Sequence, residues 1–353
     1  MRRRFLGQMG GVAWALWAGA PARAAEPQPR IKVAQIGVSH GHASKLGIYR
    51  QSADYEVVGL CEPDAALRRS VAEQPWCRGL PWLSREELLA LPGLQAVLIE
   101  SEMRDSLEHA AACVQAGMHV HVDKPAGESL PQLKRLFDLA TKRQRLVQTG
   151  YMFRYNPAVL LLKMFLNHGW LGEVFEVHGV MSKVVTPAGR KAHARYPGGM
   201  MFELGCHVID LVVGILGQPD QVTAFPRQSS PAPDGLVDNM LAVFEYPRAT
   251  ASVRATGLEV EGFSRRHLSV VGTGGTFHIQ PLDAPTATIS LDQPREKYKA
   301  GTQVIQFPKY ERYIGDAADM ARIIRGESPA TFGPAHDLAV QETILRASGL
   351  SVS

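Results

Sequence analysis

Three side chains of this 353-residue chain have the types and spacing needed to move a proton on and off a hydroxyl group. Glu203 and His207 are four residues apart, so on one helix they would share a face, and Lys124 precedes a proline. A histidine, whose reference pKa is about 6.5, can accept a hydroxyl proton. A lysine beside the same oxygen can stabilise the developing alkoxide charge. By spacing alone, the three are more simply a surface lysine and a surface helix pair.

A strand followed by a glycine-containing turn predicts a binding place for phosphate. The apolar run at 31–36 indicates a buried strand, and a helix is expected at 43–50. Backbone N–H groups of such a turn, at a helix N-terminus, suit a pyrophosphate. The glycines are spaced differently from G-x-G-x-x-G, so the turn alone is weak evidence. The cofactor-binding candidates here are Gly37, Ser39, His40, Gly41 and His42.

Glu62 stands at the end of a second predicted strand, residues 55–61. It lies near the separation from the glycine turn at which a carboxylate accepts hydrogen bonds from an adenosine ribose. Such a carboxylate favours NAD, because it would repel the extra phosphate of NADP. The neighbouring Arg68 and Arg69 keep NADP as the alternative. An ordinary strand-end carboxylate is the simpler interpretation.

The first half of the chain alternates strands and helices, which predicts a doubly wound parallel sheet over residues 30–149. Further strands are expected at 94–100, 119–122 and 146–149, and helices at 63–71, 104–116 and 130–140. Ligands of such sheets bind beyond the C-terminal ends of the strands. Gly37, Glu62, Glu100 and Lys124 all fall at that edge. Glu100 and Lys124 are therefore further cofactor-binding candidates.

Residues 150–353 predict a second α/β domain with an open, largely antiparallel sheet and helices on one face. Strands are expected at 172–182, 240–246, 251–256, 267–271, 276–279 and 286–291, and helices at 155–167, 201–216, 310–325 and 335–348. The last helix could return to pack on the first domain. The substrate-binding candidates are Tyr151, Arg154, Asn156 and Asp210, with core packing or helix capping as the alternative.

The first 24 residues are typical of an export signal. Three arginines precede Phe5-Leu6, an apolar stretch follows, and the segment ends in Ala22-Arg23-Ala24, a pattern that matches the twin-arginine variant. We therefore expect the twin-arginine export machinery as a partner and a periplasmic location. A ragged N-terminus or an uncleaved anchor is the alternative.

Charge and cysteine content exclude some classes of protein. The leader contains four of the 38 Lys and Arg residues and none of the 34 Asp and Glu, so the remainder is balanced. No nucleic-acid partner is expected from a balanced chain. The four cysteines lack C-x-x-C spacing and indicate neither a zinc site nor a disulfide framework. No metal site is predicted.

Several motifs occur in a fixed order: the glycine turn, the acidic strand end, Asp-Lys-Pro at 123–125, GYMFRYNP at 150–157 and GGMMFELGCHVID at 198–210. In this combination the chain, from about residue 31 to its last helix, resembles the glucose–fructose oxidoreductase / inositol dehydrogenase (Gfo/Idh/MocA) family. The resemblance implies a Rossmann domain, a second domain whose open sheet often serves oligomerisation, a nicotinamide dinucleotide, and sugar or polyol substrates. It maps the catalytic residues of the family to Lys124, Glu203 and His207.

Three departures from the family pattern concern the site. Asp123 stands where glutamate is usual, and Glu203 stands where aspartate is usual, so its carboxylate reaches further. Ser101-Glu102-Met103 replaces a Thr-Pro-Asn-like segment near the nicotinamide. The acid in that segment predicts an altered surrounding for the ring.

Export narrows the expected chemistry, because free dinucleotide is not expected in the periplasm. The cofactor, NAD or NADP, should be tightly bound and be restored within each cycle. The chain is then an oxidoreductase that couples two sugar or polyol substrates, or a redox-neutral glycosidase working through a keto-sugar. A simple dehydrogenase with exchangeable NAD is a third kind of enzyme to consider, and a nucleotide- or sugar-binding protein without turnover is the non-enzymatic hypothesis. A homo-oligomer formed through the C-terminal sheet is also expected.

Overall fold

The computed structural model describes residues 28–352, and the predicted export signal at 1–24 lies outside them. The N-terminal domain holds a five-stranded sheet in the order β2-β1-β3-β4-β5. All its neighbouring strands are parallel. The strands are β1 (Ile31–Ile36), β2 (Tyr55–Cys61), β3 (Ala96–Ile99), β4 (His119–Val122) and β5 (Val147–Thr149). The predicted doubly wound sheet is confirmed.

Helices connect these strands, and short polar residues begin several of them. They are η1 (Ala43–Lys45), α1 (Leu46–Gln51), α2 (Ala65–Val71), α3 (Arg85–Leu89), α4 (Met103–Gln115) and α5 (Leu130–Arg143). The side chain of Asp64 caps α2, and Ser84 forms a capping box with Glu87 at α3. Helix α3 was not predicted. The helix expected at 43–50 is a 3₁₀ turn followed by a short α-helix.

The C-terminal domain holds an eight-stranded sheet in the order β13-β12-β11-β10-β6-β9-β8-β7. Only the central β6–β9 pair is parallel, so the sheet is largely antiparallel, as predicted. The strands are β6 (Val174–Ser182), β7 (Gln221–Arg227), β8 (Asn239–Glu245), β9 (Thr250–Thr256), β10 (His267–Gly272), β11 (Gly275–Ile279), β12 (Thr286–Leu291) and β13 (Gly301–Gln306). The two edge strands, β7 and β13, were not predicted.

The remaining helices include the elements that position the site. They are η2 (Met152–Tyr155), α6 (Pro157–Asn167), α7 (Pro187–His193), the π-helical turn η3 (Met201–Gly205), α8 (Cys206–Leu216), α9 (Gly262–Arg265), α10 (Ile314–Ile324) and α11 (Pro334–Ala347). Helices α6 and α8 bury Phe165 and Val208 in one core with Val177 of the sheet. Within residues 28–352, no helix is long and apolar enough to cross a membrane.

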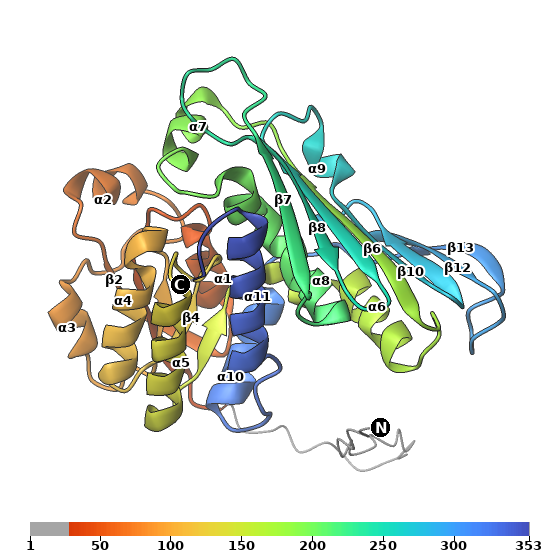
Figure 1. The fold of residues 1–353 in the computed structure, drawn as a ribbon. Helices are drawn as coiled ribbons and strands as arrows, with labels where there is room; N and C mark the ends of the chain where they lie inside the picture. Colours follow the sequence, from red (N-terminus) through yellow and green to blue (C-terminus); the bar gives the residue numbers. More distant parts are fainter. Residues whose placement is uncertain (1–27, 353) are drawn as a thin grey trace, which may run out of the picture.

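The last two helices return to the N-terminal domain. Figure 1 shows α11 beside α5, and the Gln341 side chain donates a 2.8 Å hydrogen bond to the backbone oxygen of Gly127. Met320 of α10 lies in the core that contains β1 and β2. The prediction that the final helix packs on the first domain is therefore confirmed.

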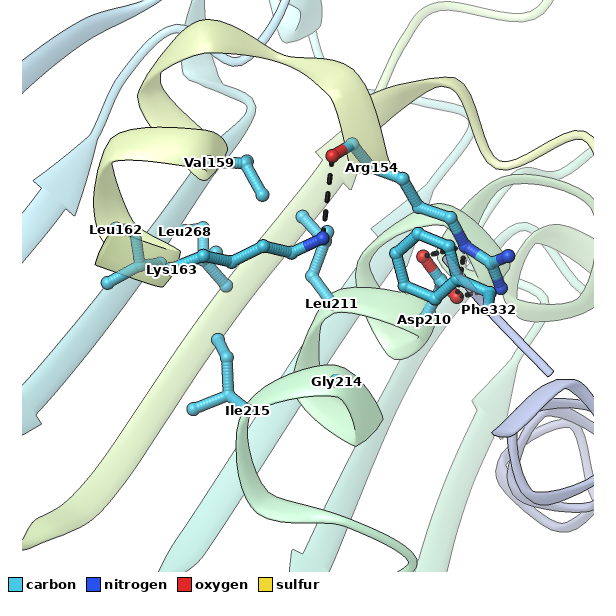
Figure 2. Close-up of a pocket in the computed structure, with 10 residues that line it drawn as sticks. All are labelled: Arg154, Val159, Leu162, Lys163, Asp210, Leu211, Gly214, Ile215, Leu268 and Phe332. Carbon is cyan, nitrogen blue, oxygen red and sulfur yellow. Dashed lines mark hydrogen bonds and ion pairs between the residues drawn. The ribbon is translucent and has the colours of Figure 1, made fainter. Parts of the chain in front are cut away.

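A buried ion-pair network ties the start of the second domain to α8 and α11. The Arg154 guanidinium lies 2.6 Å from Oδ1 of Asp210 and 2.6 Å from Oδ1 of Asp337. It also stacks 4.0 Å from the ring centre of Phe332 (Figure 2). The adjoining cavity is about 20 Å³, which is room for a single water molecule rather than a sugar.

These contacts correct the prediction that Arg154 and Asp210 bind substrate, because both side chains are buried and committed to each other. Asn156 is fully buried as the N-cap of α6, where its side chain accepts hydrogen bonds from Ala158 and Val159. Tyr151 is buried against Arg154. The packing and capping alternative therefore describes all four residues.

We expect Arg154→Ala to lower the free energy of unfolding by about 3–5 kcal/mol, because it leaves two carboxylates buried without their cation. The matched control is Arg248→Ala, since Arg248 is 77% exposed in its pair with Glu173. That change should leave stability almost unaltered. Urea unfolding followed by circular dichroism measures both, and equal losses in the two variants would contradict the structural role.

Candidate functional site

The predicted site residues follow neighbouring strands at one edge of the parallel sheet. Gly37, Glu62, Glu100 and Lys124 come directly or almost directly after β1, β2, β3 and β4. Gly37 has φ +90°, and a Cβ there would lie 2.3 Å from the backbone nitrogen of Ser101. Only glycine therefore lets the turn pass so close to the chain that follows β3.

A cavity of about 550 Å³ lies beside the end of β2. Glu62 lines it, and its two carboxylate oxygens accept hydrogen bonds from the backbone nitrogens of Val38 (3.1 Å) and Asp64 (3.0 Å). Trp82 and Leu83 form an apolar part of the cavity wall, and Arg68 contributes a positively charged side chain. These residues are of the kinds that hold a base and a ribose, with Glu62 placed for the ribose hydroxyls.

The glycine turn differs from the expected anion site in how its N–H groups are used. The backbone nitrogen of Val38 donates to Glu62, that of His40 to the oxygen of Glu100, and that of His42 to His40 Nδ1. The backbone nitrogen of Gly37 donates to the oxygen of Cys61, so among the described residues the N–H groups of the turn outside these bonds are those of Ser39 and Gly41. A pyrophosphate would therefore be held by the backbone N–H groups of Ser39 and Gly41. The first helical turn, η1, begins directly after His42.

A second cavity, about 310 Å³, opens between the two domains. The Rossmann side contributes Ser39, His40 and Gly41 of the turn and residues 101–103. The C-terminal domain contributes Lys183, Ala192, His193, Arg195, Tyr196 and Glu203. The residues that sequence reasoning missed belong to residues 183–196, which run from the end of β6 to just beyond α7 and carry no recognisable motif. Their place in the cavity comes from the tertiary fold alone.

Lys124 and Glu203 meet at the wall of this cavity. The Lys124 ammonium donates a 2.7 Å hydrogen bond to the backbone oxygen of Glu203 and lies 3.6 Å from its Oε1. The other carboxylate oxygen lies 3.7 Å from the ammonium of Lys183. Of the three predicted catalytic residues, Glu203 lines the cavity, whereas Lys124 lies buried behind it.

Charge interactions fix the ionisation of this pair. Burial alone would raise the pKa of Glu203, but the ammonium groups of Lys124 and Lys183 hold it well below its ordinary value. Burial would lower the pKa of Lys124, yet the Glu203 carboxylate keeps it above its ordinary value. The pair therefore consists of an ammonium and a carboxylate, and Lys124 acts as a hydrogen-bond donor.

His207 lies in the first turn of α8, directly after the π-helical turn that carries Glu203. Its ring centre is 5.5 Å from that of Phe153 and 5.8 Å from that of His42. Burial, with the nearby Lys124 charge, holds the pKa of His207 well below 6.5, so the imidazole is neutral. Its Nδ1 makes no hydrogen bond within the described part of the chain. A neutral, unengaged imidazole can accept a proton.

The structure departs from the prediction that Glu203 and His207 share one face of a regular helix. The carboxylate faces two lysines and does not orient the imidazole. The reason is the wider π turn between the two residues, which breaks the regular α-helical spacing on which the prediction relied. Glu100, a predicted cofactor residue, is fully buried beside Lys45 and lines neither cavity.

Glu102, the unusual acid near the expected nicotinamide, joins the two domains at the cavity entrance. Its carboxylate accepts a hydrogen bond from the Tyr196 hydroxyl and lies 3.3 Å from the Arg195 guanidinium. Arg104 stacks 5.4 Å from the Tyr196 ring centre. We call these residues, Glu102, Arg104, Arg195 and Tyr196, the interdomain clasp.

Comparisons with known proteins agree with this geometry. Residues 31–151 match the oxidoreductase family with an NAD-binding Rossmann fold, and residues 159–278 match the Gfo/Idh/MocA C-terminal domain. An inositol 2-dehydrogenase of Streptomyces avermitilis is 32% identical over 245 residues, which cover 66% of this chain and 67% of that protein. An uncharacterized oxidoreductase of Schizosaccharomyces pombe is 26% identical over 231 residues, 63% of either chain.

The share of each curated relative that aligns with this chain varies, and it is only 39% for an Escherichia coli oxidoreductase. Among solved structures, a UDP-N-acetylglucosamine 3-dehydrogenase from Acidithiobacillus ferrooxidans superposes with a TM-score of 0.75 at 18% identity, over 92% of this chain and 99% of that one. An NAD-binding oxidoreductase from Klebsiella pneumoniae superposes with a TM-score of 0.78 at 17% identity, over 91% and 96%. These two similarities concern the fold.

The order of motifs, the two domains and the sheet-edge site thus agree with the family matches, and the chain belongs to the Gfo/Idh/MocA family of NAD-binding oxidoreductases.

Proposed function

We propose that this protein oxidises or reduces a hydroxyl-bearing carbon of a sugar, a polyol or a sugar derivative with a nicotinamide dinucleotide. The observation that carries the proposal is the Lys124–Glu203 pair at the wall of the interdomain cavity, with the neutral His207 one turn further along the chain. The inositol 2-dehydrogenase named above supports the substrate class, since its name specifies a polyol.

Each of the three residues has a distinct part in this chemistry. The Lys124 ammonium donates a hydrogen bond to the substrate oxygen and stabilises the alkoxide charge. The neutral His207 imidazole takes the hydroxyl proton. Glu203, a carboxylate held between two ammonium groups, accepts a hydrogen bond from a neighbouring sugar hydroxyl. The cofactor, when bound, supplies the hydride acceptor or donor.

The residues around the two cavities fit such a cofactor. Glu62 would hold the adenosine ribose, and Ser39 and Gly41 would hold the pyrophosphate. We further propose that the cofactor is NAD, because the fixed carboxylate of Glu62 repels a ribose phosphate. Arg68 in the same cavity is the feature that would favour NADP instead.

The proposed export has a chemical consequence for turnover. If the chain acts in the periplasm, a dinucleotide that dissociates is lost, so the cofactor stays bound and its redox state is restored within each cycle. Two coupled substrates, one oxidised and one reduced, satisfy this requirement.

We expect the purified protein to carry a dinucleotide, identified as NAD by mass spectrometry after denaturation. Candidate sugars and polyols should change the absorbance of the bound nicotinamide, and product analysis should show paired oxidised and reduced sugars. Absence of any dinucleotide, or a bound one that no sugar changes, would favour a binding protein over an enzyme. A hydrolysed glycoside without net oxidation would identify the glycosidase alternative.

Lys124→Ala and His207→Ala should each lower turnover by about 10²–10⁴-fold while keeping most of the bound dinucleotide, because both act on the substrate proton and oxygen. His178→Ala is the matched control, since His178 is a half-exposed histidine of β6, outside both cavities. Normal turnover in both site variants would refute the assignment.

The export proposal is checked by replacing the arginine pair Arg2 and Arg3 with lysines. This change preserves charge but removes the twin-arginine signature, so the protein should shift from the periplasmic to the cytoplasmic fraction. An unchanged distribution would count against twin-arginine export.

A further inference from the structure

A second set of polar side chains lies at the glycine turn and has no catalytic role in the chemistry proposed above, although His40 also lines the interdomain cavity. His40 and His42 come from the turn itself, Glu100 follows β3, and Asp123 follows β4. Both carboxylates are buried, and the imidazoles are mostly buried. We call these four residues the turn cluster.

Three of the four side chains, those of His40, His42 and Asp123, bring their ligand atoms within 4.8 Å of one another, and Glu100 lies beside them. Asp123 Oδ1 lies 3.1 Å from His42 Nδ1 and 3.5 Å from His40 Nδ1. Glu100 Oε2 lies 3.6 Å from the same His40 nitrogen. Ligand atoms that share one metal ion at about 2.0–2.1 Å are separated by about 3–3.4 Å, so the cluster is close to this spacing before any ion binds.

A buried lysine holds the two carboxylates in this orientation. The Lys45 ammonium lies 2.9 Å from Glu100 Oε1 and contacts Asp123 Oδ2. Glu100 thus gives one oxygen to the lysine and turns the other toward His40. Both oxygens of Asp123 lie close to His42 Nδ1, and its Oδ1 also accepts a 2.6 Å hydrogen bond from the backbone nitrogen of Lys124. Outer partners that orient metal-binding carboxylates have this arrangement in metalloproteins.

The net charge of the turn cluster and Lys45 favours binding of a cation. Two carboxylates against one ammonium give the buried group a net negative charge when the histidines are neutral. Glu100 has no exposed surface, and its Oε2 makes no hydrogen bond within the described part of the chain. A buried carboxylate oxygen without a partner is costly, and a cation bound beside it would relieve that cost.

We propose that the turn cluster binds one divalent transition-metal ion through His40, His42 and Asp123, with the Glu100 carboxylate beside them as an outer partner. Two imidazoles with a carboxylate suit zinc, iron, manganese or cobalt and are a poor set for calcium or magnesium, which prefer oxygen ligands. Binding replaces the hydrogen bond from the His42 nitrogen to His40 Nδ1 and fixes the glycine turn.

The ion would stand close to the site without belonging to the roles assigned to Lys124 and His207. The ring of His42 is 5.8 Å from that of His207, and Asp123 precedes Lys124 in the chain. A cation at this place adds positive potential on the side of the cavity where alkoxide charge would develop. The binding itself is independent of which substrate the protein uses.

The test is metal binding by the full chain, produced without a polyhistidine tag or chelator. Metal content is measured by inductively coupled plasma mass spectrometry, and metal-stripped protein is titrated with Co²⁺ while its visible absorption is recorded. We expect about one equivalent of Co²⁺ per chain, displaced by Zn²⁺. X-ray absorption of the loaded wild type should show two imidazole ligands, a result that needs no variant.

His40→Ala/His42→Ala should lower Co²⁺ affinity by at least about 100-fold, and Glu100→Gln, which keeps the side-chain shape, by at least about tenfold. His178→Ala should bind as the wild type does, because its histidine is half-exposed on β6. Wild type that binds no Co²⁺, that shows no imidazole ligand, or that binds no better than the double variant overturns the proposal and leaves the cluster as an ion-pair network.

Discussion

The site depends on one contact across the domain boundary, in which the Lys124 ammonium binds the backbone oxygen and carboxylate of Glu203. The lysine belongs to the edge of the Rossmann sheet, and its partner belongs to a turn of the other domain. A buried ammonium needs such partners, because its desolvation would otherwise favour the neutral amine. The same contact therefore aligns the domains and keeps the lysine charged.

The electrostatic surroundings then separate the roles of similar groups. Lys183 also faces Glu203, but burial lowers its pKa, whereas the pKa of Lys124 is raised. His207 stays neutral because it is buried beside a cation and has no close carboxylate partner. Lys124 is thus a hydrogen-bond donor, Glu203 a hydrogen-bond acceptor and His207 a base that accepts a proton. The residue types alone would permit several other assignments of these roles.

Much of this arrangement could be predicted from local sequence patterns, and the remainder could not. The edge positions of Gly37 and Glu62 were predictable, because buried parallel strands give continuous apolar runs whose ends can be read directly. The edge strands β7 and β13 were not, since their mostly exposed residues lack that pattern. Arg154 was misassigned because its partner Asp337 lies 183 residues away, a separation that no local pattern records.

The return of α10 and α11 to the first domain has a mechanical consequence. The polypeptide leaves the Rossmann domain after β5 and comes back to it after β13, so the eight-stranded sheet is tethered at both ends. A domain that is connected to its neighbour at two points of the chain cannot rotate freely about either connection. Two covalent attachments therefore restrict how far the two halves can turn relative to each other, and they keep the clasp residues of the two domains opposite one another.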